Sequence, residues 1–125
     1  MELPEDLYYT KDHEWMSGKK GNVKVGVSGY AIEQLGDIVH IELPEPGDEF
    51  EAGDSFGTIE STKTVSDLYL PAAGKIIAIN DAIQESPEKL AESPYEDGWL
   101  IKVELTSSPE ELLSSAEYES FIQDS

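Results

Sequence analysis

The fold of this chain is decided by one stretch, Phe56-Gly57-Thr58-Ile59-Glu60-Ser61-Thr62-Lys63-Thr64-Val65-Ser66-Asp67-Leu68-Tyr69-Leu70-Pro71. Two short runs in which apolar and polar residues alternate flank Lys63, and this pattern is typical of the two arms of a β-hairpin. We therefore expect Lys63 at the hairpin tip, exposed and directed away from the core. A projecting ammonium group of this kind suits the covalent attachment of another group.

The neighbours of Lys63 favour such a modification. The amine of an acceptor lysine must be accessible, because it has to lose its proton transiently before it attacks an activated acyl group. Thr62 and Thr64 are small and leave room for a modifying enzyme that reads the shape of the backbone. A lysine taken by itself is most often a solvated charge, and the chain has eight of them. The position of Lys63 between the two strands is therefore what favours a modification there.

The sequence before the hairpin also favours β-structure. Period-two patterns predict short strands within residues 8–15 and a strand through 23–27, and a shared apolar face predicts a helix over 31–35 that ends at Gly36. Alternation returns over residues 37–43. That pattern predicts a strand with three apolar side chains on one side: Val39, Ile41 and Leu43.

An internal repeat relates the segments 41–48 and 68–75, which begin 27 residues apart. Both have the pattern apolar, any, Leu, Pro, any, any, Gly. Two copies of one strand and turn predict two similar small sheets that face each other, in a sandwich or flattened barrel with approximate twofold symmetry. We expect the glycine of the second copy, Gly74, to need a positive φ, so that its replacement destabilises the fold.

The last third of the chain combines strand and helix signals. Ser86 as N-cap and Pro87 as first helical residue predict a brief helix that ends near Glu92, and a strand follows over 99–105. A helical segment is expected over about 108–124. It would start with the capping-box spacing Ser108–Glu111 and present an apolar stripe of Tyr118, Phe121 and Ile122. We expect a single domain over residues 1–125, with Trp15 and Trp99 in its core.

Composition excludes several classes of function. The chain has 125 residues and a net charge of −19, with eight lysines and no arginine, so binding to nucleic acid or to an anionic membrane surface is disfavoured. No apolar run is long enough to cross a membrane. No targeting segment is seen at the N-terminus, which favours a cytoplasmic protein or an already mature one. His13-Glu14 begins a zinc-protease motif, but Ser17 stands where the second histidine belongs, so no metal site is predicted.

In order and spacing, several stretches together resemble the H-protein family of the glycine cleavage system, and the resemblance covers almost the whole chain. The stretches are His13-Glu14-Trp15, Gly26-Val27-Ser28, Leu35-Gly36-Asp37-Ile38-Val39, Glu60-Ser61-Thr62-Lys63, Ser66-Asp67-Leu68-Tyr69 and Ser93-Pro94-Tyr95-Glu96-Asp97-Gly98-Trp99-Leu100-Ile101-Lys102. The resemblance implies a mainly β, lipoyl/biotinyl-type (hammerhead) fold with short peripheral helices and a C-terminal helix.

The resemblance also implies a function. Lys63 would carry lipoate in an amide bond, and the arm would take an aminomethyl group from glycine decarboxylase to aminomethyltransferase and electrons to dihydrolipoamide dehydrogenase. Glu14 and Asp67 match the carboxylates expected where the loaded arm rests. A separate enzyme would attach lipoate, and the chain, expected to be a monomer, would catalyse nothing itself. The absence of cysteine fits, since no protein thiol can exchange with the lipoyl sulfurs.

Other functions remain open at this stage. A biotinyl carrier has a similar architecture but usually has methionine on both sides of its lysine, and a lipoyl domain of a 2-oxoacid dehydrogenase normally has aspartate before it. An enzyme that uses paired carboxylates is possible in principle, although no spacing singles out a pair. An H-like protein that donates lipoyl groups to other complexes, or an unmodified binding module, would have the same hairpin.

Overall fold

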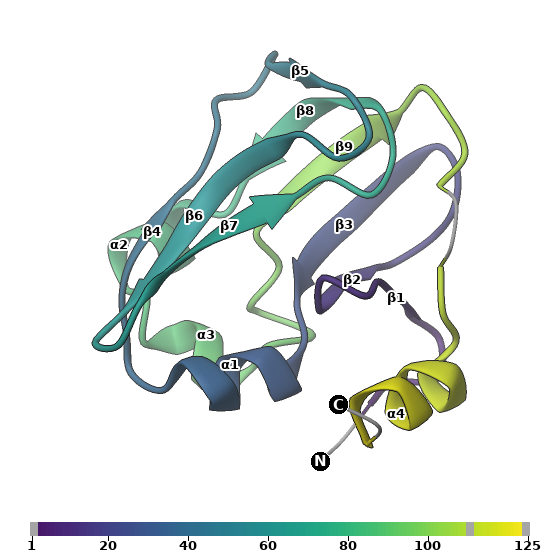
Figure 1. The fold of residues 1–125 in the computed structure, drawn as a ribbon. Helices are drawn as coiled ribbons and strands as arrows, with labels where there is room; N and C mark the ends of the chain where they lie inside the picture. Colours follow the sequence, from purple (N-terminus) through teal and green to yellow (C-terminus); the bar gives the residue numbers. More distant parts are fainter. Residues whose placement is uncertain (1–2, 110–111, 124–125) are drawn as a thin grey trace.

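The computed structural model describes residues 3–109 and 112–123 and contains two antiparallel sheets (Figure 1). The six-stranded sheet has the order β1 (Tyr8–Tyr9), β2 (Glu14–Met16), β3 (Asn22–Val27), β9 (Ile101–Leu105), β8 (Gly74–Ile79) and β5 (Glu49–Phe50). The three-stranded sheet has the order β4 (Ile38–Glu42), β6 (Ser55–Ser61) and β7 (Val65–Tyr69). The helices are α1 (Gly29–Leu35), α2 (Asp81–Glu85), α3 (Lys89–Glu92) and α4 (Ser115–Gln123).

The two sheets hold the main apolar core between them. Side chains that alternate inward on both sheets are almost completely buried, among them Val25, Ile41, Ile59, Ile76 and Ile101. Each such side chain stabilises the fold by roughly 1.5–3 kcal/mol relative to exposure. The predicted class, a mainly β domain of two facing sheets with peripheral helices and a C-terminal helix, is confirmed. The described strands form two separate sheets and no closed barrel.

The internal repeat marks two equivalent crossings between the sheets. Each copy leaves the three-stranded sheet, from β4 or from β7, and enters the six-stranded sheet as β5 or β8. These two strands pair with each other, with Phe50 opposite Gly74, and the N–H of Gly47 donates to the carbonyl of Ile76 at 2.7 Å. The repeat therefore specifies how the chain joins the two layers.

The predicted inward face of β4 is wrong at Val39. The register of β4 against β6 shifts between Ile38 and His40, as at a β-bulge, so both Ile38 and Ile41 face the core. Val39 is 50% exposed as a result. A bulge inserts one residue and reverses the alternation locally, which a strict period of two cannot anticipate.

The helix predicted from Ser86 is also placed wrongly. Ser86 is the C-cap of α2. The sequence pattern missed α2, because its five residues are too few to show a helical period. The helix α3 begins only at Lys89, although it ends at Glu92 as expected. Asn80, which precedes α2, is buried, and its side-chain amide donates to the carbonyls of Asp97 and Trp99 at 2.8 and 2.7 Å. These bonds tie the start of α2 to the turn before β9.

The C-terminal helix begins at Ser115 and not at 108. Glu110 and Glu111 of the predicted capping box lie outside the described residues. The cap that the structure shows is reciprocal: the N–H of Ser114 donates to Oε1 of Glu117 at 2.9 Å, and the N–H of Glu117 donates to Oγ of Ser114 at 3.2 Å. Before it, Leu113 pairs in extended form with Tyr9.

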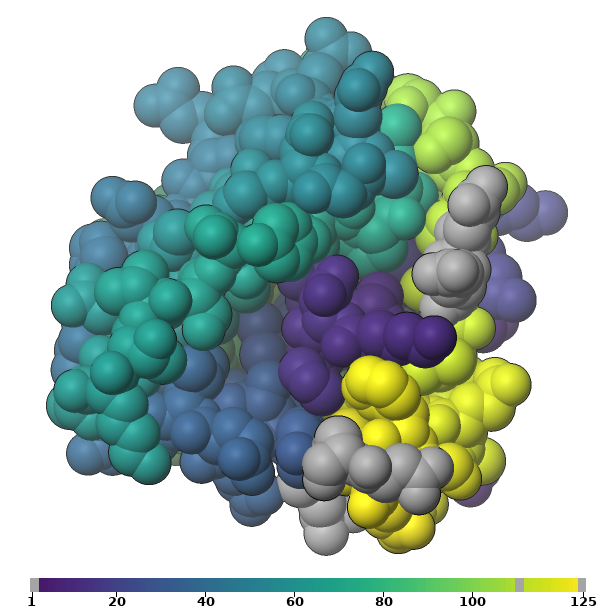
Figure 2. Space-filling model, viewed as in Figure 1, coloured from purple at the N-terminus to yellow at the C-terminus, as the bar shows by residue number. Residues whose placement is uncertain are grey.

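The apolar stripe of α4 packs against the N-terminal strands. Tyr118 is fully buried, and its ring stacks on Tyr9 at 4.9 Å. Figure 2 shows the N-terminal segment, in purple, between the hairpin region, in teal, and α4, in yellow. Of the two tryptophans predicted in the core, only Trp15 is buried; Trp99 is partly exposed beneath the ammonium groups of Lys24 and Lys102.

The turn glycine Gly74 has no positive φ, so the expected backbone reason for it is wrong. A Cβ added there would collide with the side chain of Val103 and lie 2.8 Å from the carbonyl oxygen of Glu104.

We therefore predict that Gly74→Ala lowers the free energy of unfolding by about 1–3 kcal/mol through overpacking, measured by urea denaturation. Gly18→Ala, where a Cβ would meet Val23 Cγ1 at 3.3 Å and, among the described residues other than its chain neighbours, no backbone atom within 4 Å, should lower it by less than Gly74→Ala does. Equal stability of Gly74→Ala and the parent chain would contradict this account.

Candidate functional site

The hairpin tip is ordered by one buried hydroxyl group. Lys63 lies in the three-residue connection between β6 and β7 and is exposed, which confirms its predicted place. Ser61 Oγ accepts hydrogen bonds from the N–H groups of Lys63 at 3.1 Å and of Thr64 at 3.2 Å. The N–H of Ser61 donates to the carbonyl of Thr64 at 2.8 Å. The backbone of Lys63 is thus fixed while its side chain stays exposed.

A second contact attaches the tip to the end of α1. The N–H of Thr62 donates to the carbonyl of Asp37 at 3.0 Å. A Cβ at Gly36, the C-cap of α1 with φ 84°, would lie 3.6 Å from Cε and 3.8 Å from Nζ of Lys63. The lysine side chain therefore passes over this glycine, and the hairpin tip contacts the end of α1 through both backbone and side chain.

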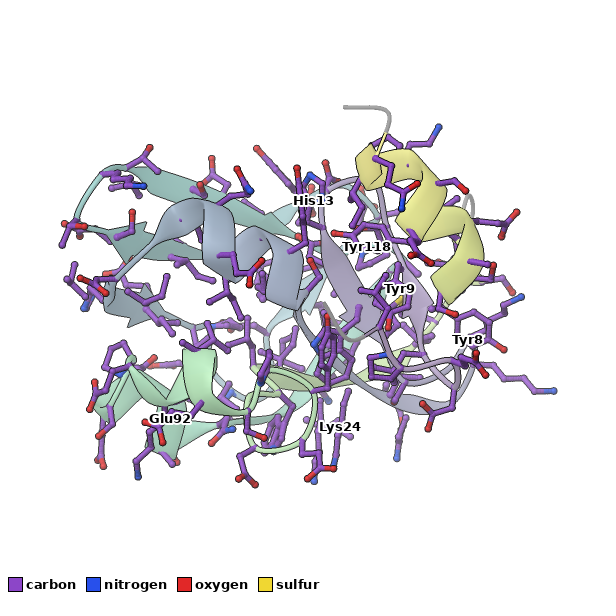
Figure 3. The ribbon with its side chains drawn as sticks, turned by 90° about the horizontal axis from the view of Figure 1, so that it is seen from below. Tyr8, Tyr9, His13, Lys24, Glu92 and Tyr118 are labelled. Carbon is purple, nitrogen blue, oxygen red and sulfur yellow. The ribbon has the colours of Figure 1, made fainter. Side chains whose placement is uncertain are left out.

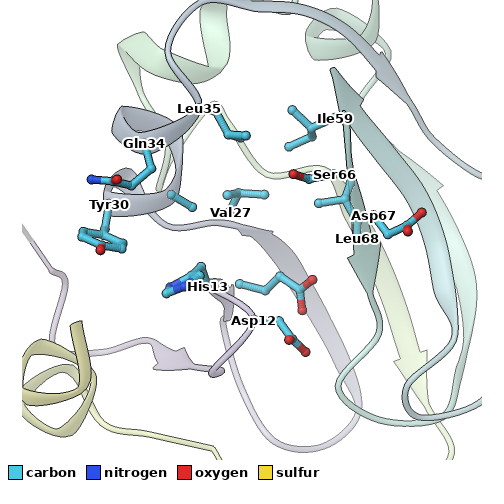
Figure 4. A pocket seen from close by; sticks show the side chains of 12 residues that line it. Asp12, His13, Val27, Tyr30, Gln34, Leu35, Ile59, Ser66, Asp67 and Leu68 are labelled. Atoms are coloured by element: carbon cyan, nitrogen blue, oxygen red, sulfur yellow. The ribbon is translucent and has the colours of Figure 1, made fainter. Parts of the chain in front are cut away.

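A cleft of about 270 Å³ lies between α1, the segment before β2 and the hairpin strands (Figure 4). Figure 4 shows Leu35 and Ile59 at one end and Asp12 at the other. Leu35 is next to Gly36, so the apolar end adjoins the segment that Lys63 contacts. The full lining is Asp12, His13, Glu14, Val27, Tyr30, Ala31, Gln34, Leu35, Ile59, Ser66, Asp67 and Leu68.

Glu14 supplies a buried carboxyl group to the polar end. Its side chain is 2% exposed, and Oε2 accepts a hydrogen bond from the N–H of Tyr69 at 2.7 Å. Oε1 is buried without a hydrogen-bond partner among the described residues. Burial raises the pKa of Glu14 to about 8, although the Tyr69 hydrogen bond opposes this shift. The carboxyl group therefore keeps its proton to a higher pH than an exposed glutamate does.

Asp67 lies in the same lining but in a different environment. Its side chain is exposed, and its two carboxylate oxygens lie 3.4 Å from the hydroxyl of Ser55 and 3.5 Å from that of Tyr69. Figure 4 shows this carboxylate turned away from His13. The structure thus brings both predicted acids to one cleft, and only Glu14 has its carboxyl group buried there.

His13 is a part of the cleft that sequence reasoning did not assign. Its backbone φ is 69°, and its Nδ1 lies 2.8 Å from the hydroxyl of Tyr118 in α4. Figure 3 shows His13, Tyr118 and Tyr9 together beside that helix. The residues of this hydrogen bond are 105 positions apart, and no local pattern in the sequence points to it.

Residues 3–109 and 112–123 lack two further features. No three His, Cys, Asp or Glu side chains within these ranges come together as metal ligands would. No helix within them is long and apolar enough to pass through a bilayer.

Comparison with known proteins gives a consistent result over nearly the full length. A family model described as glycine cleavage H-protein matches residues 7–125. A glycine cleavage system H protein of Oceanobacillus iheyensis is 50% identical over 99% of this chain and 100% of its own length. One of Anaeromyxobacter sp. strain K is 46% identical, covering 99% and 98% of the two chains. The crystal structure of such a protein from Mycobacterium marinum superposes with a TM-score of 0.93 at 43% identity, covering 97% of this chain and 99% of that one.

The buried carboxyl group of Glu14 predicts a specific pH dependence of stability. In the unfolded chain the carboxyl group titrates near 4.5 and in the folded chain near 8, so between these values only the folded state holds the proton. The free energy of unfolding should therefore fall as pH rises through this window, by up to about 1.4 kcal/mol per pH unit.

Urea denaturation from pH 5 to pH 8 measures this effect. Glu14→Gln, which has no carboxyl group at this position, should lose less stability than the parent chain over the window. Glu60→Gln, at an exposed glutamate of β6, should follow the parent chain. Parallel curves for Glu14→Gln and the parent chain would mean that Glu14 is ionised in the folded state.

Proposed function

The chain belongs to the glycine cleavage H-protein family, and on this basis we propose that it acts as a lipoyl-bearing carrier with lipoate in amide linkage on Lys63. The proposal rests on two features that occur side by side: an exposed lysine on an ordered hairpin tip, and a cleft beside it that ends at a buried carboxyl group. The tip offers its amine to a lipoate-attaching enzyme, and the cleft offers the attached arm a place to rest.

The lining of the cleft suits such an arm. Apolar side chains next to the tip, such as Leu35 and Ile59, match a hydrocarbon chain. The polar end has an acid, Glu14, whose Oε1 has no hydrogen-bond partner in the part of the chain that the structure describes. When attached, lipoate supplies sulfur atoms that accept the aminomethyl group of glycine and, after its transfer, release electrons. The aminomethyl group is a cation when protonated, and a buried carboxylate is a favourable partner for it.

Glu14 binds the cationic head in this proposal. In the empty cleft its carboxyl group keeps a proton at neutral pH, because burial raises its pKa to about 8. A cation that enters the cleft displaces this proton and leaves an ion pair in a site of low polarity, where water has little access. Asp67, exposed at the edge of the cleft, adds negative charge that favours entry of the cation.

The chain itself performs no catalysis in this proposal. Glycine decarboxylase loads the arm, aminomethyltransferase unloads it and dihydrolipoamide dehydrogenase reoxidises it. Attachment to Lys63 raises the effective concentration of the arm at each of these active sites. An ordered tip limits the backbone freedom that is lost on docking, while the side chain and the arm stay free to reach.

We predict that Lys63→Arg abolishes both lipoylation and glycine breakdown. The chain is treated with a lipoate ligase, digested and analysed by mass spectrometry, and then assayed with glycine, tetrahydrofolate and the three partner enzymes. Modification is expected on the Lys63 peptide alone, with no turnover by Lys63→Arg. The free energy of unfolding should change by less than about 0.5 kcal/mol, since the side chain is exposed.

Lys75→Arg, at an exposed lysine of β8, is the matched control and should behave as the parent chain. Lipoylation at another lysine, or glycine breakdown that persists in Lys63→Arg, would refute the proposal. A chain that is lipoylated on Lys63 but supports no glycine breakdown would point to donation of lipoyl groups to other complexes.

A further inference from the structure

Three side chains from distant parts of the sequence meet at one hydroxyl group behind the cleft. The Tyr118 hydroxyl lies 2.8 Å from Nδ1 of His13 and 2.7 Å from Oγ of Ser28. Ser28 is the N-cap of α1 and His13 lines the cleft. The N–H of Ser28 also donates to the carbonyl of His13 at 2.9 Å. Tyr118 of α4 therefore holds both the start of α1 and the histidine wall of the cleft.

The direction of these hydrogen bonds follows from counting hydrogens. Ser28 Oγ accepts from the N–H of Ala31 at 3.2 Å, and Ser28 is fully buried. The hydroxyl hydrogen of Ser28 has one acceptor within reach among the described residues, the oxygen of Tyr118. The hydrogen of Tyr118 must then point to its other neighbour, Nδ1 of His13. The ring nitrogen Nδ1 is thus an acceptor, and the ring proton lies on Nε2.

Both alternative states of the ring leave a buried hydrogen without an acceptor. If Nδ1 of His13 carried a proton, in the other neutral tautomer or in the cation, it would donate to Tyr118, whose hydrogen would turn to Ser28. The hydrogen of Ser28 would then have no partner in a fully buried position, which is unfavourable. The hydrogen-bond chain therefore selects one neutral tautomer.

We propose that Tyr118 is a positioning residue of the cleft, which holds His13 neutral as its Nε2–H tautomer and so keeps a second positive charge away from the cationic cargo. The cargo is the aminomethyl group of the proposed function. The effect on the cargo rests on that function, whereas the assignment of the His13 tautomer does not. Burial independently lowers the pKa of His13, while Asp12 opposes this. The other titratable groups in contact with the ring are Tyr30 of α1 and Tyr118 itself. Glu14 of its own segment and Asp67 of β7 line the same cleft.

Nitrogen-15 NMR of the imidazole rings in the unmodified chain tests the proposal without any cofactor. At pH 7 the parent chain should show His13 with an unprotonated Nδ1 and a protonated Nε2, as one tautomer. Tyr118→Phe should give a mixture of tautomers and a midpoint of titration at higher pH. His40, the other histidine and an exposed residue of β4, is an internal reference. Tyr9→Phe, which removes a hydroxyl that donates to Pro4, is the matched control and should leave His13 unchanged.

The loaded protein gives a second readout. Hydrolysis of the cargo consumes one water, leaves a thiol on the arm and releases formaldehyde and ammonium. Formaldehyde release should be about fivefold faster in Tyr118→Phe, the factor for a loss of about 1 kcal/mol, and unchanged in Tyr9→Phe. A protonated Nδ1 in the parent chain at pH 7 overturns the proposal even if Tyr118→Phe fails to fold. If His13 shows the expected tautomer but Lys63 is not lipoylated, the proposed function is refuted and the role of Tyr118 in holding His13 is retained.

Discussion

The structure depends on one constraint, that the strands β6 and β7 bury their inner side chains while the residue between them stays in solvent. Ile59 and Leu68 face the core, and Glu60 and Asp67 on the same strands face outward. Burial of the inner pair fixes the register, because a slip by one residue would turn every side chain to the opposite face. With the register fixed, the turn has to fall at residues 62–64, and Lys63 is the residue that projects.

The cleft is built from groups that are unfavourable for stability taken singly. The carboxyl group of Glu14 is 2% exposed, has one oxygen without a partner among residues 3–109 and 112–123, and is next in sequence to a histidine with a positive φ. Such features persist where the surrounding structure enforces them, and they gather at functional sites. Here the enforcement comes from the N–H of Tyr69 on the hairpin side and from Tyr118 on the α4 side. The hairpin and the C-terminal helix thus act on the same cleft from opposite walls.

Local signals predicted the parts of the fold that short stretches specify. The hairpin and its tip, the strand β3 and the end of α1 at Gly36 follow from alternation and from one glycine. Two features depend on contacts with other segments, which a local sequence period does not reveal. They are the bulge that exposes Val39 and the two short helices on either side of Ser86. In the candidate site, the place of Lys63 followed from the hairpin pattern, whereas Glu14 and Asp67 were expected only from the family resemblance. The bond from Tyr118 to His13 could not be predicted, because it joins residues 105 positions apart.

The central claim is that the arm attached at Lys63 brings a cation to the carboxyl group of Glu14. Carbon-13 NMR of this carboxyl group, followed from pH 5 to pH 9 in the lipoylated chain with and without the aminomethyl cargo, tests the claim most directly. The account predicts a pKa of about 8 for Glu14 in the empty cleft and a decrease of more than about one unit when the cargo is bound. Identical titration curves in the two states would contradict it.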